Sequence, residues 1–307
     1  MLKFPLKTSM KTLFETSLSL PLIQKGKVRD IYDIDDKRML IITTDRLSAF
    51  DVVFPKPIAG KGQVLTEVAN FWFEKTQHLI PNHLTYEPLD SVLTPAEIKQ
   101  VEGRAIIVKK LKPLPIEAIV RGYLIGSGWK DYQTSGKICG IELPKNLRLA
   151  EKLPTALYTP SNKAAVGDHD ENIDFAQTVA IVGEDLAQQI KQTSLALYNF
   201  ASDYALKKDI IIADTKFEFG LDENNQLTLM DEVLTPDSSR FWSKADYRIG
   251  TSPKSFDKQI VRDYLETLDW DKTPPAPNLP DNITHTTAQQ YHQVQQLLTQ
   301  SNKRDNA

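Results

Sequence analysis

The segment from Ile210 to Gly220 reads IIIADTKFEFG, in which three charged residues alternate with apolar or small ones. Side chains of a β-strand point alternately to its two faces, so Asp214, Lys216 and Glu218 share one face. The two phenylalanines of the segment then face a core. The segment therefore predicts a strand that is charged on one face and apolar on the other.

A second strand is predicted after the polar turn DENN at residues 222–225, and it reads LTLMDEV over residues 227–233. Together the two strands predict a β-hairpin, in which Asp231 and Glu232 lie beside the charged face of the first strand. Mg²⁺ prefers hard oxygen ligands, usually one or two carboxylates with waters and phosphate oxygens. The hairpin thus predicts a magnesium–phosphate site. A solvated sheet face with cross-strand salt bridges is the alternative.

A glycine-rich loop follows a predicted strand in the segment PIEAIVRGYLIGSG, residues 115–128. The strand ends at Arg121, a residue type suited to forked recognition of phosphate or carboxylate, and Ser127 can donate a hydroxyl. The alternative is a turn that only starts a helix at Trp129, with Ser127 as its cap. The turn TPDSSR, residues 235–240, adds hydrogen-bonding groups where the second hairpin strand ends and so favours a binding site.

Near the N-terminus a glycine lies between cations in QKGKVR, residues 24–29. This segment could fold over nucleotide phosphates, although it lacks the glycine spacing and the terminal Lys-Ser/Thr of a Walker loop. An exposed strand end is the alternative. The segments DRLSAFD, residues 45–51, and GKG, residues 60–62, are expected to be capped turns, with ligand contact as the other interpretation.

The polar loop from Tyr158 to Asn172 is predicted to bind substrate because it is long and polar. His169 lies in this loop between two aspartates and could bind a metal or act as a base. A hydrogen-bonded loop histidine ahead of a helix is the alternative.

The remaining pattern predicts two lobes built from short strands and amphipathic helices. Strands are expected at residues 27–34, 38–44, 104–109 and 116–121, and helices at 62–78, 172–208 with a break at Gly183, 255–268 and 286–300. Pro113 and Pro115 are expected to interrupt the strands around them, because proline cannot donate to a ladder. We therefore expect lobes at 1–113 and 114–271, and a tail with a helix at 272–307.

The composition is that of an ordinary globular protein, with 307 residues, a net charge of -3 and a pI near 6.0. This charge provides no basic field for a nucleic-acid backbone. The only cysteine, Cys139, excludes an intramolecular disulfide and fits a reducing compartment. The N-terminus lacks the features of a signal peptide, and no segment approaches the roughly 18 apolar residues of a membrane span. We expect a cytoplasmic protein that binds neither nucleic acid nor membrane.

Six motifs in this order resemble the SAICAR synthetase family, in its longer, monomeric variety, over about Leu22 to Leu268. The two most diagnostic motifs lie at residues 115–127 and 212–220, and the other four at 26–32, 44–51, 159–163 and 231–242. One departure is Ile125, where the family usually carries threonine or alanine. We expect altered loop packing there rather than lost function.

The resemblance implies an α+β fold of two lobes, with antiparallel sheets and packed helices, related to ATP-grasp ligases. It implies a ligase of purine biosynthesis that uses ATP and Mg²⁺ and joins the carboxylate of carboxyaminoimidazole ribonucleotide (CAIR) to the amine of L-aspartate. Residues 1–113 would bind the nucleotide, and residues 114–271 would hold substrate and metal. We expect a monomer.

The resemblance also assigns a role to each candidate residue. Lys216 and Arg121 would be catalytic, and Lys216 would bind the transferring phosphoryl group of the nucleotide. The nucleotide would further contact Gly26, Lys27 and Arg29, and Glu218 and Asp231 would hold Mg²⁺. CAIR would be held by Arg121, Ser127, Lys163, Asp237, Arg240, Lys258 and Arg262. Two alternatives share the nucleotide site: another carboxylate–amine ligase or a small-molecule kinase, and a nucleotide-binding module without activity.

Overall fold

The computed structural model of the protein describes residues 12–163 and 171–300. Contacts along the chain group the described residues into two compact units, one of residues 12–71, 84–110 and 256–300, and one of 72–83, 111–163 and 171–255. This grouping differs from the predicted lobes, because residues 256–300 group with the N-terminal part of the chain. His169 lies outside the described residues.

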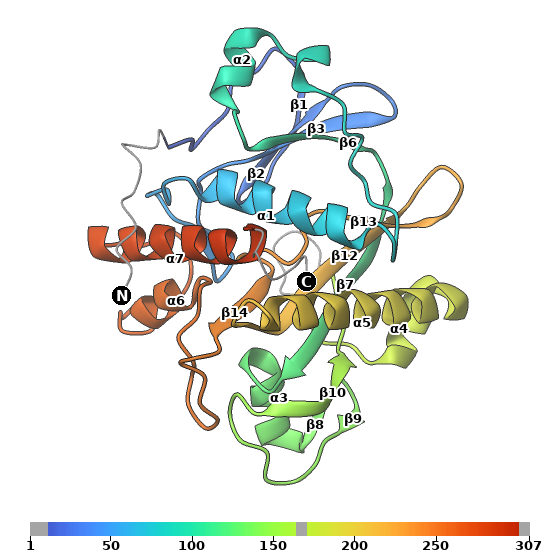
Figure 1. Ribbon diagram of the computed structural model, residues 1–307, viewed down its shortest axis with the longest axis vertical. Coiled ribbons are helices and arrows are strands. Elements are labelled where there is room, and N and C mark those ends of the chain that lie inside the picture. Colours follow the sequence, from blue (N-terminus) through green and yellow to red (C-terminus); the bar gives the residue numbers. More distant parts are fainter. Residues whose placement is uncertain (1–11, 164–170, 301–307) are drawn as a thin grey trace. The chain divides into compact units, whose positions relative to one another are not determined.

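The first unit contains a four-stranded antiparallel sheet with the strand order β1-β2-β3-β6 (Figure 1). Its strands are β1 (Leu22–Lys25), β2 (Arg29–Asp33), β3 (Arg38–Thr43) and β6 (Ala105–Lys109). The predicted hairpin is confirmed, since β2 pairs with β3 and Arg29 lies opposite Thr43. Apolar side chains on one face of the sheet, among them Leu40 and Ile107, form a core cluster with Val101.

Helices and short elements complete the first unit. They are β4 (Ser48–Ala49), β5 (Val52–Val53), most of α1 (Lys61–Thr76), η1 (Leu89–Ser91), α2 (Pro95–Gln100), α6 (Gln259–Leu265) and α7 (Asp281–Thr299). The predicted helices are confirmed, although α6 is shorter and α7 begins earlier than expected. Leu47 and Phe54 share one apolar cluster with Val261, Leu265 and Ala288. This shared core explains why the C-terminal helices group with the N-terminal segment.

The second unit contains a six-stranded sheet with the order β10-β7-β12-β13, while β11 pairs with β7 and β14 pairs with β12 (Figure 1). Its strands are β7 (Lys112–Tyr123), β10 (Lys152–Tyr158), β11 (Ser161–Asn162), β12 (Ile210–Leu221), β13 (Leu227–Met230) and β14 (Ser239–Ser243). Its other elements are α3 (Gly126–Ser135), β8 (Lys137–Ile138), β9 (Ile141–Glu142), α4 (Phe175–Val182) and α5 (Glu184–Leu206). All pairings within both main sheets are antiparallel, as expected for this α+β fold.

Helix α5 packs on the β7–β12 part of this sheet. The hydroxyl of Tyr198 donates to the Ile212 carbonyl at 2.7 Å. A Cβ added at Gly122 would overlap the same hydroxyl, so close approach of the helix requires glycine there. Because neighbouring residues of a strand face opposite ways, Arg121 points away from α5. The face of the sheet that carries Arg121 is therefore the one available for a site. The predicted break between α4 and α5 at Gly183 is confirmed.

Two details of the sheet differ from expectation. The prediction that Pro113 and Pro115 interrupt the strand is wrong, because β7 begins at Lys112 and runs through both. The prolines lie at its first residues, and the Pro115 carbonyl still accepts a hydrogen bond from Lys163 N at 3.1 Å. In addition, β13 ends at Met230, because Asp231 has a φ of 69° in the left-handed region. Asp231 and Glu232 were predicted within the strand and instead follow its end.

No helix within residues 12–163 and 171–300 is long and apolar enough to cross a membrane.

Candidate functional site

Two charged residues of β12 lie opposite charged residues of β7. In the antiparallel register Asp214 pairs with Arg121, and Glu218 pairs with Glu117. Directly opposed residues of two strands have side chains close enough to interact. The prediction that Asp214, Lys216 and Glu218 share one face is supported by ion pairs among their side chains and those of β7. The buried Phe217 and Phe219 alternate with them, as expected.

Two arginines converge on Asp214. Arg121 Nη1 lies 3.2 Å from Asp214 Oδ2, and Arg240 Nη1 contacts the same oxygen. Arg121 also donates to Thr159 Oγ1 at 3.0 Å and to Ser127 Oγ at 2.9 Å, and the residue is 3% exposed. Burial lowers the pKa of Arg121 below its ordinary value, and Asp214 opposes that shift. A guanidinium remains cationic in proteins, so Arg121 is a buried cation held in one orientation.

The glycine-rich loop makes room for these two arginines. Helix α3 begins at Gly126, before the Trp129 of the alternative interpretation, and Ser127 accepts from Arg121 instead of capping the helix. A Cβ at Gly126 would lie 2.6 Å from Arg240 Nη2, and one at Gly128 would lie 3.0 Å from Arg121 Cδ. A side chain at either position would force an arginine side chain to shift, so the two glycines favour the close approach of the loop to Arg121 and Arg240.

A second charged group surrounds Lys216. Its Nζ lies 3.1 Å from Glu117 Oε1 and contacts Glu218 Oε1, while Lys163 contacts Glu218 Oε2. Burial lowers the pKa of Lys216, but Glu218 and then Asp231 and Glu117 outweigh it, so the pKa is raised above its ordinary value. Lys216 therefore carries a proton throughout the physiological range. It can donate hydrogen bonds to an oxyanion but cannot act as a general base.

The turn at residues 235–240 is organised by the buried Thr235. Its hydroxyl donates to Glu232 Oε2 at 2.5 Å and accepts from Asp237 N at 3.2 Å, and its carbonyl accepts from Ser239 N at 2.9 Å. These bonds fix the entry into β14, where Arg240 is paired with Asp214 of β12. The turn thus leads directly into Arg240, which contacts Asp214 beside Arg121.

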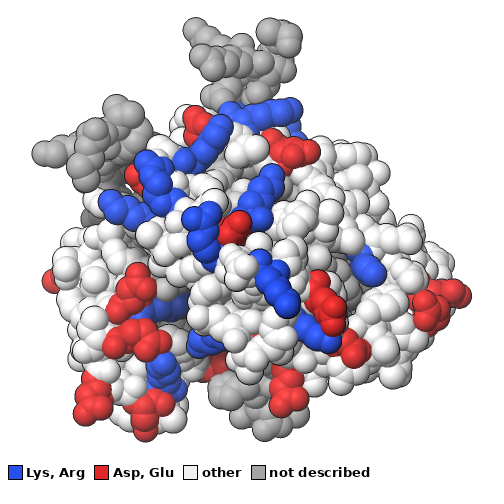
Figure 2. Space-filling model, turned by 90° about the horizontal axis from the view of Figure 1, so that it is seen from below, with Lys and Arg blue, Asp and Glu red and all other residues white. Residues whose placement is uncertain are grey.

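The surface charge is mixed in sign. The face drawn in Figure 2 carries both basic and acidic side chains, with acidic ones lying among the basic ones. The net charge of -3 over the whole chain agrees with this mixture. Anionic ligands would therefore depend on local groups such as the two arginines around Asp214, as predicted from the composition.

The other predicted residues lie in the first unit. Gly26, Lys27 and Arg29 belong to the turn between β1 and β2 and the start of β2, where Gly26 N donates to Arg29 O at 2.7 Å. Lys27 is exposed and forms an ion pair with Asp51. Lys258 and Arg262, at the start of α6 and within it, also belong to this unit. The residues predicted to bind CAIR are thus divided between the two units.

The residues predicted to hold Mg²⁺ suit that ion. Glu218 and Asp231 offer hard oxygen donors, and both oxygens of Glu218 already contact ammonium groups, so this region favours positive charge. Within the described ranges, no group of three or more His, Cys, Asp or Glu side chains could hold a metal. An Mg²⁺ that arrives with nucleotide phosphates needs only one or two carboxylates. The residues fit a nucleotide-bound ion better than a protein-enclosed one.

Three partners in these groups were not given roles of their own in the sequence analysis: Asp214, Glu117 and Thr159. Asp214 and Glu117 lie within the motifs already quoted, at even spacings from Glu218 and Arg121 respectively. The period of two predicted which face they occupy. Their contacts depend on the register between β7 and β12, which no local pattern indicates.

The chain is similar to known proteins both in sequence and in structure. A family model described as SAICAR synthetase matches residues 22–277. The phosphoribosylaminoimidazole-succinocarboxamide synthase of Methylococcus capsulatus is 62% identical, covering 95% of this chain and 99% of that protein. The protein of the same description from Thioalkalivibrio sulfidiphilus is 59% identical, with coverages of 92% and 95%. The solved structure of SAICAR-synthase from Saccharomyces cerevisiae, complexed with SAICAR, has a TM-score of 0.86 at 41% identity, with coverages of 94% and 99%.

Proposed function

The chain belongs to the SAICAR synthetase family, and on that premise we propose how its residues carry out the reaction. The enzyme is an ATP-using carbon–nitrogen ligase of purine biosynthesis that joins the carboxylate of CAIR to the amine of L-aspartate and forms SAICAR. For this chain we further propose Mg²⁺ as cofactor, a monomeric state and a cytoplasmic location.

CAIR is held by the arginine group of the second unit. The observation that carries this assignment is the convergence of Arg121 and Arg240 on the single carboxylate of Asp214. Two planar cations beside one anion suit a phosphate or carboxylate of the substrate, which guanidinium groups bind in a forked manner. Ser127, which contacts Arg121, and Asp237 are assigned to the same ligand.

The carboxylate of CAIR is activated as an acyl phosphate. One of its oxygens attacks the γ-phosphorus of ATP, the bond to the β-phosphate bridging oxygen breaks, and ADP leaves. The amine of aspartate then attacks the acyl carbon and loses a proton, and phosphate leaves with the former carboxylate oxygen. Lys216, permanently protonated among Glu117, Glu218 and Asp231, donates to the transferring phosphoryl oxygens.

Glu218 and Asp231 are the residues that would hold Mg²⁺. The ion supplies positive charge to the phosphate oxygens when it is bound. The two lysines that contact Glu218 can exchange that carboxylate for phosphate oxygens when nucleotide enters. Release of Lys216 and Lys163 toward the nucleotide then orients the γ-phosphate.

Covalent catalysis is the competing route, and two side chains of the second unit bear on it. Ser161 Oγ donates to Glu117 Oε2 at 3.2 Å, so a hydroxyl with an adjacent carboxylate does lie beside Lys216. Cys139 is a poor candidate because burial raises the pKa of its thiol to about 11, which leaves little thiolate at neutral pH. A phosphorylated serine is therefore the alternative to be tested.

Release of ADP, measured by a coupled assay, tests the reaction. We expect release to require both CAIR and aspartate. ADP formed with CAIR alone at the full rate would indicate a kinase, and activity with other amines or carboxylates would indicate a different ligase.

Oxygen-18 in the CAIR carboxylate tests the acyl phosphate. One label should appear in the released inorganic phosphate, both in the parent enzyme and in Ser161→Ala, because cleavage at the acyl carbon leaves the bridging oxygen on phosphorus. Labelled phosphate together with a phosphorylated Ser161 and loss of turnover in Ser161→Ala would assign the first phosphoryl transfer to the serine, whereas unlabelled phosphate would refute the acyl phosphate itself.

A further inference from the structure

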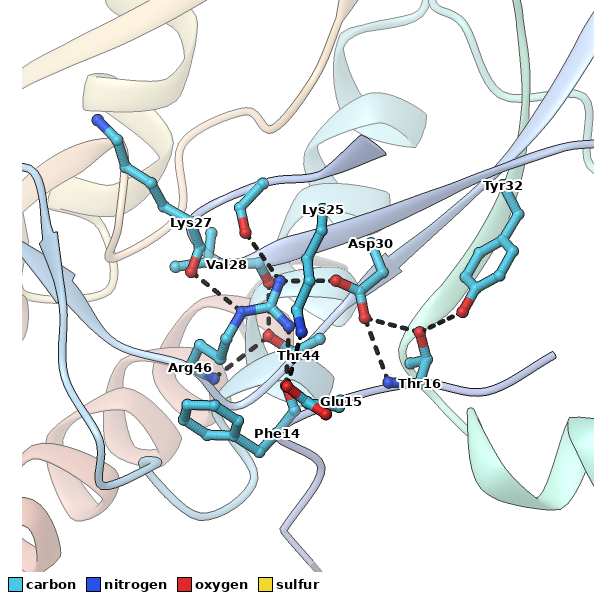
Figure 3. Close-up of polar contacts among 11 residues, drawn as sticks. Phe14, Glu15, Thr16, Lys25, Lys27, Val28, Asp30, Tyr32, Thr44 and Arg46 are labelled. Atoms are coloured by element: carbon cyan, nitrogen blue, oxygen red, sulfur yellow. Dashed lines mark hydrogen bonds and ion pairs between the residues drawn. The ribbon is translucent and has the colours of Figure 1, made fainter. Parts of the chain in front are cut away.

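A buried arginine lies beneath the turn that is proposed to hold the nucleotide phosphates. Arg46, 2% exposed, belongs to the segment 45–51, which the sequence pattern left as a capped turn. Figure 3 shows its guanidinium at the centre of a network of hydrogen bonds with the turn between β1 and β2. These hydrogen bonds compensate the arginine for its lost contact with water, and they connect it to the turn that is proposed to bind the nucleotide.

Three consecutive carbonyls of the turn face the segment that contains Arg46. Arg46 Nη2 donates to Gly26 O at 2.9 Å, and Arg46 Nε donates to Lys27 O at 3.1 Å. The next carbonyl, that of Val28, accepts from Thr44 N at 2.9 Å and from Thr44 Oγ1 at 2.8 Å. In a regular strand successive carbonyls point in opposite directions. Three successive carbonyls on one side therefore need donors from outside the turn, and Arg46 and Thr44 supply them.

The planarity of the peptide bond fixes the other side of the turn. In a trans peptide the carbonyl and the following N–H point in opposite directions. Because the carbonyls of Gly26, Lys27 and Val28 point toward Arg46 and Thr44, the N–H groups of Lys27, Val28 and Arg29 point away from them. Successive N–H groups directed to one side form a concave site that binds oxyanions such as phosphate. Figure 3 also shows the Lys27 side chain extending away from Arg46.

The positive charge of Arg46 is balanced by the carboxylate of Asp30. Arg46 therefore needs no anionic ligand to hold it beneath the turn. Arg46 Nη2 donates to Asp30 Oδ1 at 2.7 Å, and the residue Asp30 is 2% exposed. Asp30 Oδ2 accepts from Thr16 Oγ1 at 2.6 Å, and Arg46 Nη1 donates to Phe14 O at 2.7 Å. The guanidinium thus has partners on every side, and each fixes its plane.

We propose that Arg46 is a positioning residue for nucleotide binding, which holds the carbonyls of residues 26 and 27 inward so that the amides of the turn face the phosphates of ATP. The inference rests on the proposed role of Gly26, Lys27 and Arg29. Thr44 has the same role at the third carbonyl. Neither side chain touches the nucleotide, and both act through the conformation of the turn.

The variant Arg46→Lys tests this role, because lysine keeps the charge but cannot donate from a planar fork to two carbonyls and Asp30 together. Loss of one or two such bonds should raise KM for ATP and Kd for ADP about tenfold or more. KM for CAIR should stay within about twofold of the parent value, since the arginine group around Asp214 is untouched. Binding of adenosine, which has no phosphate, should not change in calorimetry.

Arg104→Lys is the matched control. Arg104 is 3% exposed in the same unit and pairs with Asp45 Oδ1 at 2.9 Å, and none of its observed bonds goes to residues 26–28. It should lower the melting temperature to a similar degree without weakening ADP binding selectively. If Arg46→Lys does not fold, Thr44→Val provides the test, because it removes one hydroxyl donor to the turn at almost constant volume and should weaken ADP binding in the same direction.

Two outcomes would overturn the proposal. The first is that Arg46→Lys or Thr44→Val weakens ADP binding no more than Arg104→Lys does. The second is that KM for ATP and KM for CAIR rise equally. In either case Arg46 is only structural. A separate Lys27→Ala variant distinguishes the premise from the inference. If ADP affinity is unchanged in that variant, the nucleotide assignment of the turn is itself wrong; if it falls while Arg46→Lys binds normally, only the positioning role is lost.

Discussion

Arg121→Lys is the substitution that examines the candidate CAIR site most directly. Lysine keeps a positive charge beside Asp214, so no carboxylate is left buried without its cation, a situation that would by itself be strongly destabilising. What changes is geometry. Arg121 donates in three directions, to Asp214, Ser127 and Thr159, whereas one ammonium at the end of a flexible stem cannot maintain all three.

The size of the effect follows from these contacts. A hydrogen bond to a charged group contributes about 1.5–3 kcal/mol, so loss of one such bond to CAIR should cost about 2 kcal/mol. That corresponds to about a thirtyfold increase in KM for CAIR. KM for ATP should change much less, because the nucleotide phosphates are assigned to cations other than Arg121. The loss of bonds to Ser127 and Thr159 should also lower the melting temperature by several degrees.

The assay is coupled ADP release with CAIR varied at saturating ATP and aspartate, repeated with ATP varied. Thermal melts define the temperatures at which each variant is folded. Arg104→Lys again serves as control, since it changes an equally buried arginine that does not contact the Asp214 group. Equal increases in KM for CAIR and ATP would refute the assignment, as would an Arg121→Lys enzyme with the parent KM for CAIR.

Three further predictions concern the metal, a close contact and the thiol. Glu218→Gln and Asp231→Asn should each raise the Mg²⁺ concentration that gives half-maximal activity, because each removes an anionic oxygen; parental titrations would make these carboxylates structural. Gly122→Ala should destabilise the protein by about 2–4 kcal/mol through overpacking and a lost hydrogen bond, and less so in a Tyr198→Phe background; additive effects in denaturant melts would contradict the contact. The rate of alkylation of Cys139 should rise with an inflection near pH 11 rather than 9.0, because burial raises the pKa of its thiol; an inflection near 9.0 would refute the burial argument. Because the folded state favours the protonated thiol, this contribution to the free energy of unfolding is complete below pH 9.0 and is lost between pH 9.0 and about 11.

The sequence alone determined what depends on neighbours along the chain. The period of two in IIIADTKFEFG requires that Asp214, Lys216 and Glu218 share a face, because the pleat of a strand leaves no other arrangement. The helix break at Gly183 and the hairpins follow from the same local rules, and the structure confirms them. Where a helix ends or a strand stops was less determined, as α6 and β13 show, because the terminal residues depend on packing and on single φ angles such as that of Asp231.

Tertiary structure decided which residues meet. Asp214 binds Arg121 and Arg240, which come from two other strands, and Lys216 reaches Glu117 across the sheet. These contacts depend on strand register and strand order, which are set by the burial of whole faces and not by any short motif. Local pattern also could not assign Arg46, since an arginine at a turn is usually solvated. Only the folded chain brings the carbonyls of Phe14, Gly26 and Lys27, together with Asp30, around its guanidinium. Desolvation is tolerated there because each of its three nitrogens finds an acceptor.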